Sequence, residues 1–415
     1  MTAPDLPAHL PLIVDEPNRS TVMRGVPVPA DKIVTGDERW LLDPDQGSWA
    51  MQNVPAFLHV DTVSRGDGPI APLTYGDSGL MRRRVDVAGL GDTTLVEASA
   101  QLDIDAFVLL KDGELRAELY RNGMRPGSRH SLNSVTKSFV ATVIGSLVDE
   151  GLLDLHAPFA DSFPELAHSG VADATLQDAL DMAIGVEWPM DWDNPRSHRY
   201  LNFMAGGFQQ RFDRFPYANT LDLIAQTKKV RPHGERYVYT AVCTELLGWS
   251  MSRALGHTWQ QALAARVWHP MGAESDGLIV VDPGGHGFAT CGLVSTLRDM
   301  ARFGLVLQNG GVCGTRRIVS ERWVDEIHTP NDRLTAAMAG SPEFALFPDL
   351  KFYHNQFRVL DPAAGEFLAL GGLGQMIFVN RAKRIVCAVQ STGYAPDQPG
   401  VVARLYAALR DALTA

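Results

Sequence analysis

Residues 130–155, HSLNSVTKSFVATVIGSLVDEGLLDL, carry the pattern from which the fold and the chemistry of this chain can both be inferred. Apolar residues recur at helical spacing after Ser134, and Gly151 can end a helix in the left-handed conformation. The pattern predicts a helix from Ser134 to Glu150. Ser134 and Lys137 are three positions apart at its start, so their side chains share one face.

This pair has the chemistry of a nucleophile and its base. A serine hydroxyl attacks a carbonyl only when a base takes its proton, and a lysine can do so in the neutral form that partial burial favours. Unpaired N–H groups at the first helical turn favour developing negative charge. The same sequence would also fit Ser134 as an ordinary helix cap and Lys137 as a solvated side chain. The pair, however, begins an apolar helix directly after a predicted hairpin. We therefore interpret Ser134 as a nucleophile and Lys137 as its base.

Strand patterns occur before and long after this helix. Residues 106–110 (AFVLL) and 114–120 (ELRAELY) flank Lys111-Asp112-Gly113, which predicts a hairpin turn with Gly113 at positive φ. Short turns separate three later apolar segments, which predicts an antiparallel meander. These segments are 367–372 (FLALGG), 375–380 (QMIFVN) and 384–391 (RIVCAVQS).

The chain between these strand regions is mostly helical in pattern. Thr175 followed by Asp178 predicts a capping box, and we expect Thr296 and Ser320 to cap two later helices. Residues 401–413 (VVARLYAALRDAL) predict a final amphipathic helix.

Strands early and late with helices between them predict an α+β fold, in which an antiparallel β-sheet flanked by helices carries an inserted helical lobe. We expect an irregular N-terminal lead-in over 1–95. The sheet domain is expected to combine 96–150 with 270–415, and 151–269 to form the mostly helical domain.

Two further motifs could complete a catalytic site. Tyr239-Thr240-Ala241 stands before a predicted helix, where the phenol could share a proton with Lys137; an ordinary packed aromatic explains it as well. Gly371-Gly372-Leu373-Gly374 follows an apolar strand, where a substrate oxygen could approach a backbone N–H closely. A tight turn that needs glycine is the alternative.

The order SVTK, then YTA, then a glycine-rich strand edge resembles the serine β-lactamase and penicillin-binding-protein superfamily. Within it the chain looks most similar to 6-aminohexanoate-dimer (nylon oligomer) hydrolases and class C-type carboxylesterases. The resemblance implies a β-lactamase/transpeptidase-like fold over residues 105–415. It also implies that Ser134 is acylated, that Lys137 and Tyr239 act as general acid and base, and that the Ser134 N–H forms an oxyanion hole with the N–H of Gly371 or Gly372.

The sequence departs from this family at two places. The second motif ends in Ala241, where Asn or Ser is common, and Leu370 and Leu373 flank the glycines where a Lys or His is usual. The missing cation weakens a β-lactamase interpretation and favours amide or ester substrates without a carboxylate at that place. Trp192, in the loop that shapes the acyl pocket of family members, could pack on an aliphatic substrate chain or between the lobes.

Bulk composition excludes some partners and compartments. A net charge of −11 and a pI near 5.5, with no basic stripe, argue against nucleic acid and anionic membranes. No apolar run approaches the length of a bilayer span and the N-terminus lacks a secretory pattern, so we expect a cytoplasmic protein. No metal and no cofactor are expected: His130, His233 and His286 lack ligand spacing. The four cysteines, Cys243, Cys291, Cys313 and Cys387, are expected to be buried fillers.

The partner expected from this sequence is a small-molecule amide or ester substrate, with a homodimer implied by the family resemblance. An amidase on linear aminoacyl oligomers, a carboxylesterase on short acyl esters, a β-lactamase and a non-catalytic binding protein with the same fold stay open at this point.

Overall fold

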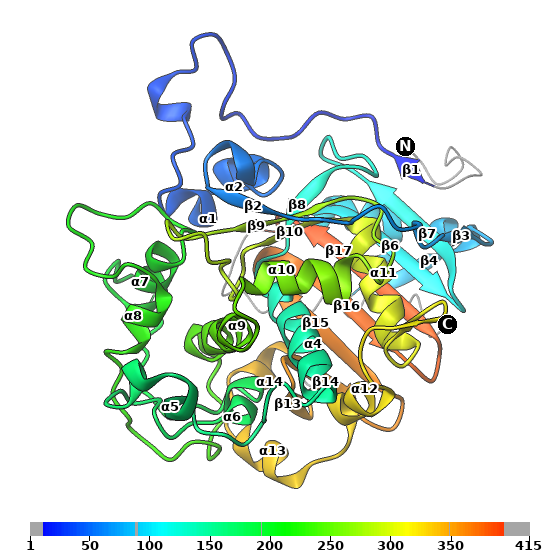
Figure 1. The fold of residues 1–415 in the computed structure, drawn as a ribbon. Coiled ribbons are helices and arrows are strands. Elements are labelled where there is room, and N and C mark those ends of the chain that lie inside the picture. The colour runs from blue at the N-terminus through cyan, green and yellow to red at the C-terminus, as the bar shows by residue number, and fades with distance from the viewer. Residues whose placement is uncertain (1–10, 88–89, 192, 348, 394–415) are drawn as a thin grey trace.

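Two sheets organise the protein, in a computed structural model that describes residues 11–87, 90–191, 193–347 and 349–393 (Figure 1). Both are antiparallel except where β1 and β3 join β7 in parallel. The larger sheet has nine strands in the order β1-β7-β6-β17-β16-β15-β14-β13, with β3 also pairing with β7. Its strands are β1 (Leu12–Ile13), β3 (Thr74–Tyr75), β6 (Ile104–Lys111), β7 (Glu114–Tyr120), β13 (Phe352–His354), β14 (Phe357–Asp361), β15 (Glu366–Gly371), β16 (Gln375–Asn380) and β17 (Ile385–Ser391).

The predicted hairpin and meander are both confirmed. Lys111 pairs with Glu114 across a two-residue turn in which Asp112 and Gly113 have φ of 55° and 80°. Positive φ at both turn residues matches the right-handed twist of the flanking strands. The C-terminal strand β17 pairs with β6, so the two halves of the sheet meet although some 270 residues separate them.

The smaller sheet has the order β2-β9-β10-β8 and leads directly into the segment that holds Ser134. Its strands are β2 (Val60–Val63), β8 (Arg129–Ser131), β9 (Gly277–Val280) and β10 (Leu293–Thr296), and two short ribbons are formed by β4 (Arg84–Val87) with β5 (Gly91–Thr94) and β11 (Val312–Cys313) with β12 (Arg316–Arg317). The N-terminal segment, expected to be irregular, thus contributes β1 and β3 to the large sheet and β2 to the small one.

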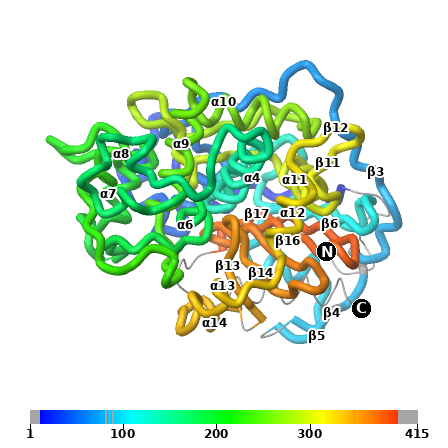
Figure 2. Tube along the Cα trace, turned by 60° about the horizontal axis from the view of Figure 1, so that its bottom comes forward, coloured from blue at the N-terminus to red at the C-terminus, as the bar shows by residue number. Residues whose placement is uncertain are grey.

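Helices pack against the large sheet and form a lobe beside it (Figures 1 and 2). The sheet-covering helices are α3 (Leu95–Gln101), α4 (Thr136–Asp149), α11 (Leu297–Gln308), α12 (Glu321–His328), α13 (Asp332–Ala337) and α14 (Glu343–Leu346). The lobe contains α5 (Phe159–Ser162), α6 (Leu176–Leu180), α7 (His198–Ala205), α8 (Thr220–Ile224), α9 (Ala241–Leu255) and α10 (Trp259–Leu263), and α1 (Arg39–Leu42) and α2 (Pro44–Ala50) precede both.

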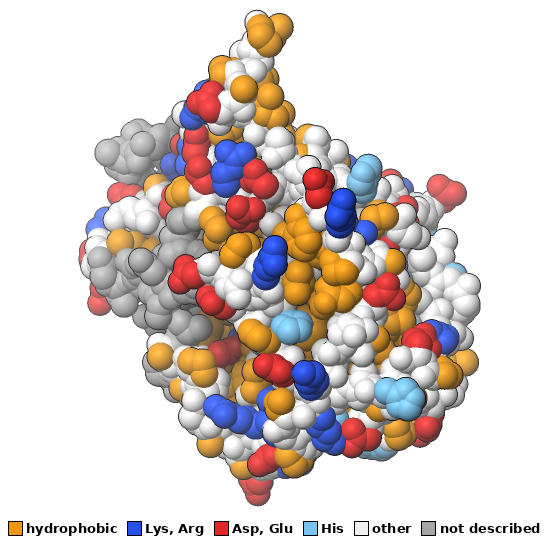
Figure 3. All heavy atoms as spheres, turned by 90° about the vertical axis from the view of Figure 1, so that its left-hand side faces the viewer, with side chains coloured by type: hydrophobic (Ala, Val, Ile, Leu, Met, Phe, Trp, Pro, Cys, Tyr) orange, Lys and Arg blue, Asp and Glu red, His pale blue; other side chains and the backbone are white. Residues whose placement is uncertain are grey.

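The inserted lobe and the antiparallel sheet flanked by helices confirm the predicted fold class. The division into three sequence ranges stays a prediction. Figure 3 shows the face of the molecule on the side of this lobe, where acidic and basic side chains are interspersed around an apolar area.

The core between α4, α11 and the sheet fixes the helix that carries Lys137. Phe139 of α4 stacks on Phe303 of α11 with ring centroids 3.8 Å apart. Gly304 lets α11 approach β17, since a Cβ there would lie 2.4 Å from Val386 Cγ1. Close packing of this kind fixes the position of α4 relative to the sheet.

The predicted helix signals are confirmed with one shift. Thr175 and Asp178 form a reciprocal capping box, Thr296 and Ser320 accept N–H bonds as N-caps, and Gly151 has φ of 71°. The α-helix α4 begins at Thr136, because the preceding residues form the 3₁₀ turn η5 (Asn133–Val135).

Two predictions lie outside the described residues: the helix over 401–413 and the position of Trp192. Among the residues that are described, no helix combines the length and apolarity that crossing a membrane requires.

Candidate active site

The predicted nucleophile and base lie in direct contact. Lys137 Nζ donates a hydrogen bond to Ser134 Oγ at 2.9 Å and another to the Thr290 carbonyl oxygen at 2.6 Å. Lys137 is 2% exposed, whereas Ser134 is partly exposed. The amine is therefore shielded and held by two acceptors, while the hydroxyl that it contacts can be reached from solvent.

The backbone before α4 places Ser134 at the junction of the two sheets. The N–H of Leu132 donates to the Leu293 carbonyl at 2.8 Å, and Asn133 then takes a positive φ of 46°. The turn η5 follows at once, so the Ser134 N–H belongs to the first turn of a helical segment, where N–H groups lack an intrahelical acceptor.

The glycine-rich strand edge lies against this turn. A Cβ built on Gly371 would stand 2.4 Å from the Leu132 carbonyl oxygen and 3.1 Å from the Ser134 nitrogen. Asn133 Nδ2 also donates to the Gly372 carbonyl at 2.8 Å. Only a residue without a side chain fits at Gly371, so glycine at this position serves the close approach of β15 to the nucleophile.

Tyr239 stands beside the lysine at the start of α9. Its half-buried ring has its centroid 5.2 Å from Lys137 Nζ and 5.1 Å from Arg358 Cζ. Thr240 is the extended N-cap residue of α9, which turns the chain from a loop into the helix. The structure therefore brings together the three catalytic candidates and the two glycines, as the sequence predicts.

Arg358 is one residue that the sequence patterns did not single out. It lies on β14 and is paired through two hydrogen bonds, of 2.7 and 2.8 Å, with Glu343. Tyr237 also donates to Glu343, at 2.6 Å. Arg358 is thus a cation beside Tyr239 that is already engaged by a carboxylate.

Glu245 and Thr290 were also missed. Glu245 Oε1 accepts from the Thr290 N–H at 2.8 Å and from its hydroxyl at 2.6 Å. Burial raises the pKa of Glu245 to about 7, against the opposing effect of these hydrogen bonds. The available signal was a lone acid inside the apolar helical stretch AVCTELLGW, where an unpartnered charge would be costly.

The three histidines lie in structural contacts. His130 is buried and lies 3.4 Å from Asp105, and the ring of His286 stacks 3.7 Å from that of Trp249. Burial lowers the pKa of His286 to about 4. His233 accepts the Gly185 N–H at 2.9 Å. The described residues contain no cluster of His, Cys, Asp and Glu that could hold a metal ion.

The cysteines are free thiols in the structure. Cys243, Cys291 and Cys387 are buried as predicted, whereas Cys313 is half-buried and donates to the Met271 carbonyl. Burial raises the pKa of Cys291, next to Thr290, to about 12, so this thiol is neutral and unreactive.

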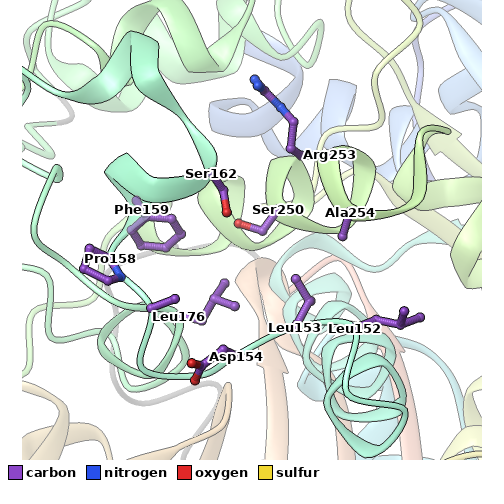
Figure 4. Close-up of a pocket in the computed structure, with 11 residues that line it drawn as sticks. Leu152, Leu153, Asp154, Pro158, Phe159, Ser162, Leu176, Ser250, Arg253 and Ala254 are labelled. Atoms are coloured by element: carbon purple, nitrogen blue, oxygen red, sulfur yellow. The ribbon is translucent and has the colours of Figure 1, made fainter.

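A cavity of about 380 Å³ opens in the helical lobe, away from this site (Figure 4). It is lined by residues such as Leu153, Phe159 and Ser250, which follow α4 or lie on α5 and the second half of α9. Ser134 precedes α4 and the cavity lies beyond its other end, roughly 20 Å along a helix of this length. The cavity is therefore separate from the candidate active site.

Comparisons with known proteins show the family of the chain and its fold. The family model described as Beta-lactamase matches residues 94–412. The 6-aminohexanoate-dimer hydrolase of Paenarthrobacter ureafaciens is 31% identical over 349 residues, which cover 84% of this chain and 86% of that protein.

Solved structures share the architecture. A Bacillus anthracis protein, provisionally described as a 6-aminohexanoate-dimer hydrolase, superposes with a TM-score of 0.83 at 25% identity, over 93% of this chain and 98% of that one. A family VIII carboxylesterase has a TM-score of 0.56 at 19% identity, over 85% and 100% of the two chains, which shows the fold alone. The protein is a serine hydrolase of amide or ester bonds, and the chain belongs to the β-lactamase family.

Proposed function

We propose that the protein hydrolyses linear amides of the 6-aminohexanoate-oligomer type through an acyl-enzyme on Ser134. The observation that carries the proposal is the contact between the buried Lys137 amine and the accessible Ser134 hydroxyl, 2.9 Å long. The relative from Paenarthrobacter ureafaciens, similar over most of both chains, supports the amide substrate class.

In the first step neutral Lys137 takes the proton of Ser134 as the hydroxyl oxygen bonds to the substrate carbonyl carbon. The carbonyl oxygen becomes negatively charged and is bound by the N–H of Ser134 and an N–H at Gly371 or Gly372. Fixed backbone donors of this kind stabilise the charge that develops in the transition state. The nearness of Gly371 to the Ser134 nitrogen supports this arrangement.

In the second half the tetrahedral intermediate collapses and the C–N bond breaks. The leaving amine takes a proton from the Lys137–Tyr239 pair. Water then loses a proton to the same pair, attacks the acyl carbon and releases the acid, which restores the Ser134 hydroxyl. One acid–base pair serves both halves because the second step is chemically the reverse of the first.

The groups around the glycines favour a substrate without a carboxylate at that place. Leu370 and Leu373 flank them, and Leu373 packs into a cluster of buried apolar side chains. The nearby cation Arg358 is already paired with Glu343. Leu370, Leu373 and the paired Arg358 therefore offer no free cation to a β-lactam carboxylate. Their chemistry supports linear amides or esters as substrates instead.

A substrate panel tests the proposal. Purified protein is incubated with 6-aminohexanoate dimer, p-nitrophenyl butyrate and a penicillin, and product release is followed together with intact mass. We expect dimer hydrolysis and a fluorophosphonate adduct on the peptide that contains Ser134. Ester hydrolysis without dimer hydrolysis would make the protein a carboxylesterase. A chain that neither turns over nor forms an adduct would be a binding protein, and the proposal would be wrong.

Replacing Tyr239 by Phe is expected to lower kcat for the dimer by about 10²-fold, the usual contribution of one acid–base group, with KM nearly unchanged. The ring that packs beside Lys137 remains, so the melting temperature should stay within a few degrees of the wild type. Stopped-flow measurement of the acylation burst checks the step. A variant with wild-type turnover would remove Tyr239 from the mechanism.

The homodimer and the cytoplasmic location remain predictions. Size-exclusion chromatography with light scattering would measure the oligomeric state. Trp192, proposed to contact the acyl chain, also keeps that role as a proposal.

A further inference from the structure

We propose that Glu245 is a positioning residue for the lysine base: it holds Thr290 so that the Thr290 carbonyl aims the Lys137 amine at Ser134, and it places an acid behind that amine. The inference rests on the proposed function, since it assigns a role within the same reaction. Glu245 itself contacts neither the nucleophile nor a substrate position; it acts through Thr290.

The hydrogen bonds form a continuous chain. Lys137 Nζ donates to the Thr290 carbonyl at 2.6 Å, and the N–H and hydroxyl of Thr290 donate to Glu245 Oε1 at 2.8 and 2.6 Å. The second carboxyl oxygen, Oε2, accepts from the Thr220 hydroxyl at 3.0 Å, which in turn accepts from Trp249 Nε1 at 2.9 Å. Thr290 is thereby held through two of its own groups, so its carbonyl has one orientation.

This chain matters because an amine on a flexible four-carbon stem has many rotamers. Lys137 has a fixed acceptor on one side, Thr290, and the Ser134 hydroxyl on the other. Holding the base in one rotamer before the substrate arrives removes an entropic cost from the step in which the proton moves. Thr290 and Glu245 are buried, with 5% and 0% exposure, so water does not compete for these bonds.

The carboxyl also affects charge at the base. Lys137 is the cation whose charge lowers the pKa of Glu245, although burial still raises this pKa to about 7. A carboxylate at Glu245 favours the ammonium form of Lys137, and a neutral group there favours the amine that accepts the Ser134 proton.

The other titratable groups near this pair are accounted for. Cys291 adjoins Thr290 and is neutral, because burial raises its pKa to about 12; Arg199 acts on the same thiol. The ring centroid of Tyr239 lies 5.2 Å from Lys137 Nζ and 5.1 Å from Arg358 Cζ. The acids on the helices that pack against α9 bond elsewhere. Asp178 of α6 bonds with Thr175, and Asp181, the C-cap of α6, pairs with His354. Asp222 of α8 accepts from the Ala218 N–H and Asp149 of α4 accepts from the Ser320 N–H.

The test separates charge from position with two substitutions. In Glu245→Gln the amide oxygen can still accept from Thr290, and the amide nitrogen can donate to the Thr220 oxygen, so the geometry is kept and the charge is lost. Its acid limb of kcat/KM is expected to move to lower pH by about half a unit or more. Glu245→Ala removes the support of Thr290 as well and should lower the maximal kcat/KM by about tenfold or more.

Asp299→Asn is the matched control. Asp299 is also a buried acid that accepts backbone N–H groups and a threonine hydroxyl, but its partners are Glu274, Ser275 and Thr296, and it also pairs with the Arg302 guanidinium at 2.9 Å. This variant should have a lower melting temperature than the wild type. The pH dependence of its kcat/KM should be unchanged.

The outcomes distinguish this inference from the proposed function. If the wild-type protein hydrolyses the dimer, a Glu245→Gln variant whose acid limb has not moved would overturn the charge effect of Glu245. A folded Glu245→Ala variant with wild-type kcat/KM would overturn its positioning role. A wild-type protein without turnover or adduct would overturn the proposed function first. If Glu245→Ala fails to fold, Thr290→Val, which removes the hydroxyl that donates to Glu245, tests the positioning role through the same fall in kcat/KM.

Discussion

Ser134→Ala is expected to abolish hydrolysis of every amide and ester that the wild-type protein accepts, with a loss on the order of 10³-fold or more. The substitution removes the atom that forms the acyl bond, which is the oxygen that Lys137 Nζ contacts at 2.9 Å. The fluorophosphonate adduct should disappear from the intact-mass spectrum at the same time. Steady-state rates and labelling, measured on one protein preparation, check both effects.

Ser138→Ala is the control on the same helix. Ser138 lies on α4, one turn after Ser134, and its hydroxyl donates to the Gln356 carbonyl at 2.9 Å. Its removal should cost about 1 kcal/mol of stability, the usual value for one buried hydrogen bond, and leave labelling intact. Adduct formation that persists in Ser134→Ala would show that another residue is the nucleophile.

Lys137→Met is expected to lower kcat/KM by about 10³-fold or more, since a general base and its positioning are lost together. Methionine has a stem of similar length, so the space beside Tyr239 and Thr290 stays filled. Folding should be little affected, because an apolar group of similar length replaces a buried polar one and two hydrogen bonds are lost. Rates and thermal melts on the same sample measure the two effects.

Lys137→Arg separates charge from basicity. Arginine keeps a cation at the site but does not lose its proton in proteins, so it cannot accept the proton of Ser134. We expect this variant to be as inactive as Lys137→Met. Turnover near the wild-type rate in either variant would exclude the lysine as the base and leave the 2.9 Å contact as a structural one.

Local patterns predicted the elements that depend on neighbouring residues in the chain. The hairpin at Asp112 and Gly113 and the capping box at Thr175 need only two to four consecutive residues, and both are present. The strands β1 and β3 were not predicted. Each has two residues, too few for an alternating pattern, and each exists only because β7 offers an edge.

The same distinction applies to the candidate site. Ser134 and Lys137 lie one helical turn apart, so sequence spacing alone places them together. Tyr239 and Gly371 were placed by the resemblance to a family. Thr290 has no motif of its own. Its carbonyl contacts the lysine because the segment before β10 packs against α9. Every residue has a backbone carbonyl, so no sequence pattern marks this acceptor.

The contact between Gly371 and the turn that bears the nucleophile has a consequence for how this gene can change. Every missense codon one base away from a glycine codon encodes a residue with a Cβ, and a Cβ at this position would overlap the Leu132 carbonyl oxygen. Point mutation thus offers no gradual route away from glycine here. Diversification of substrate choice must proceed through the surrounding loops, with this strand end left untouched.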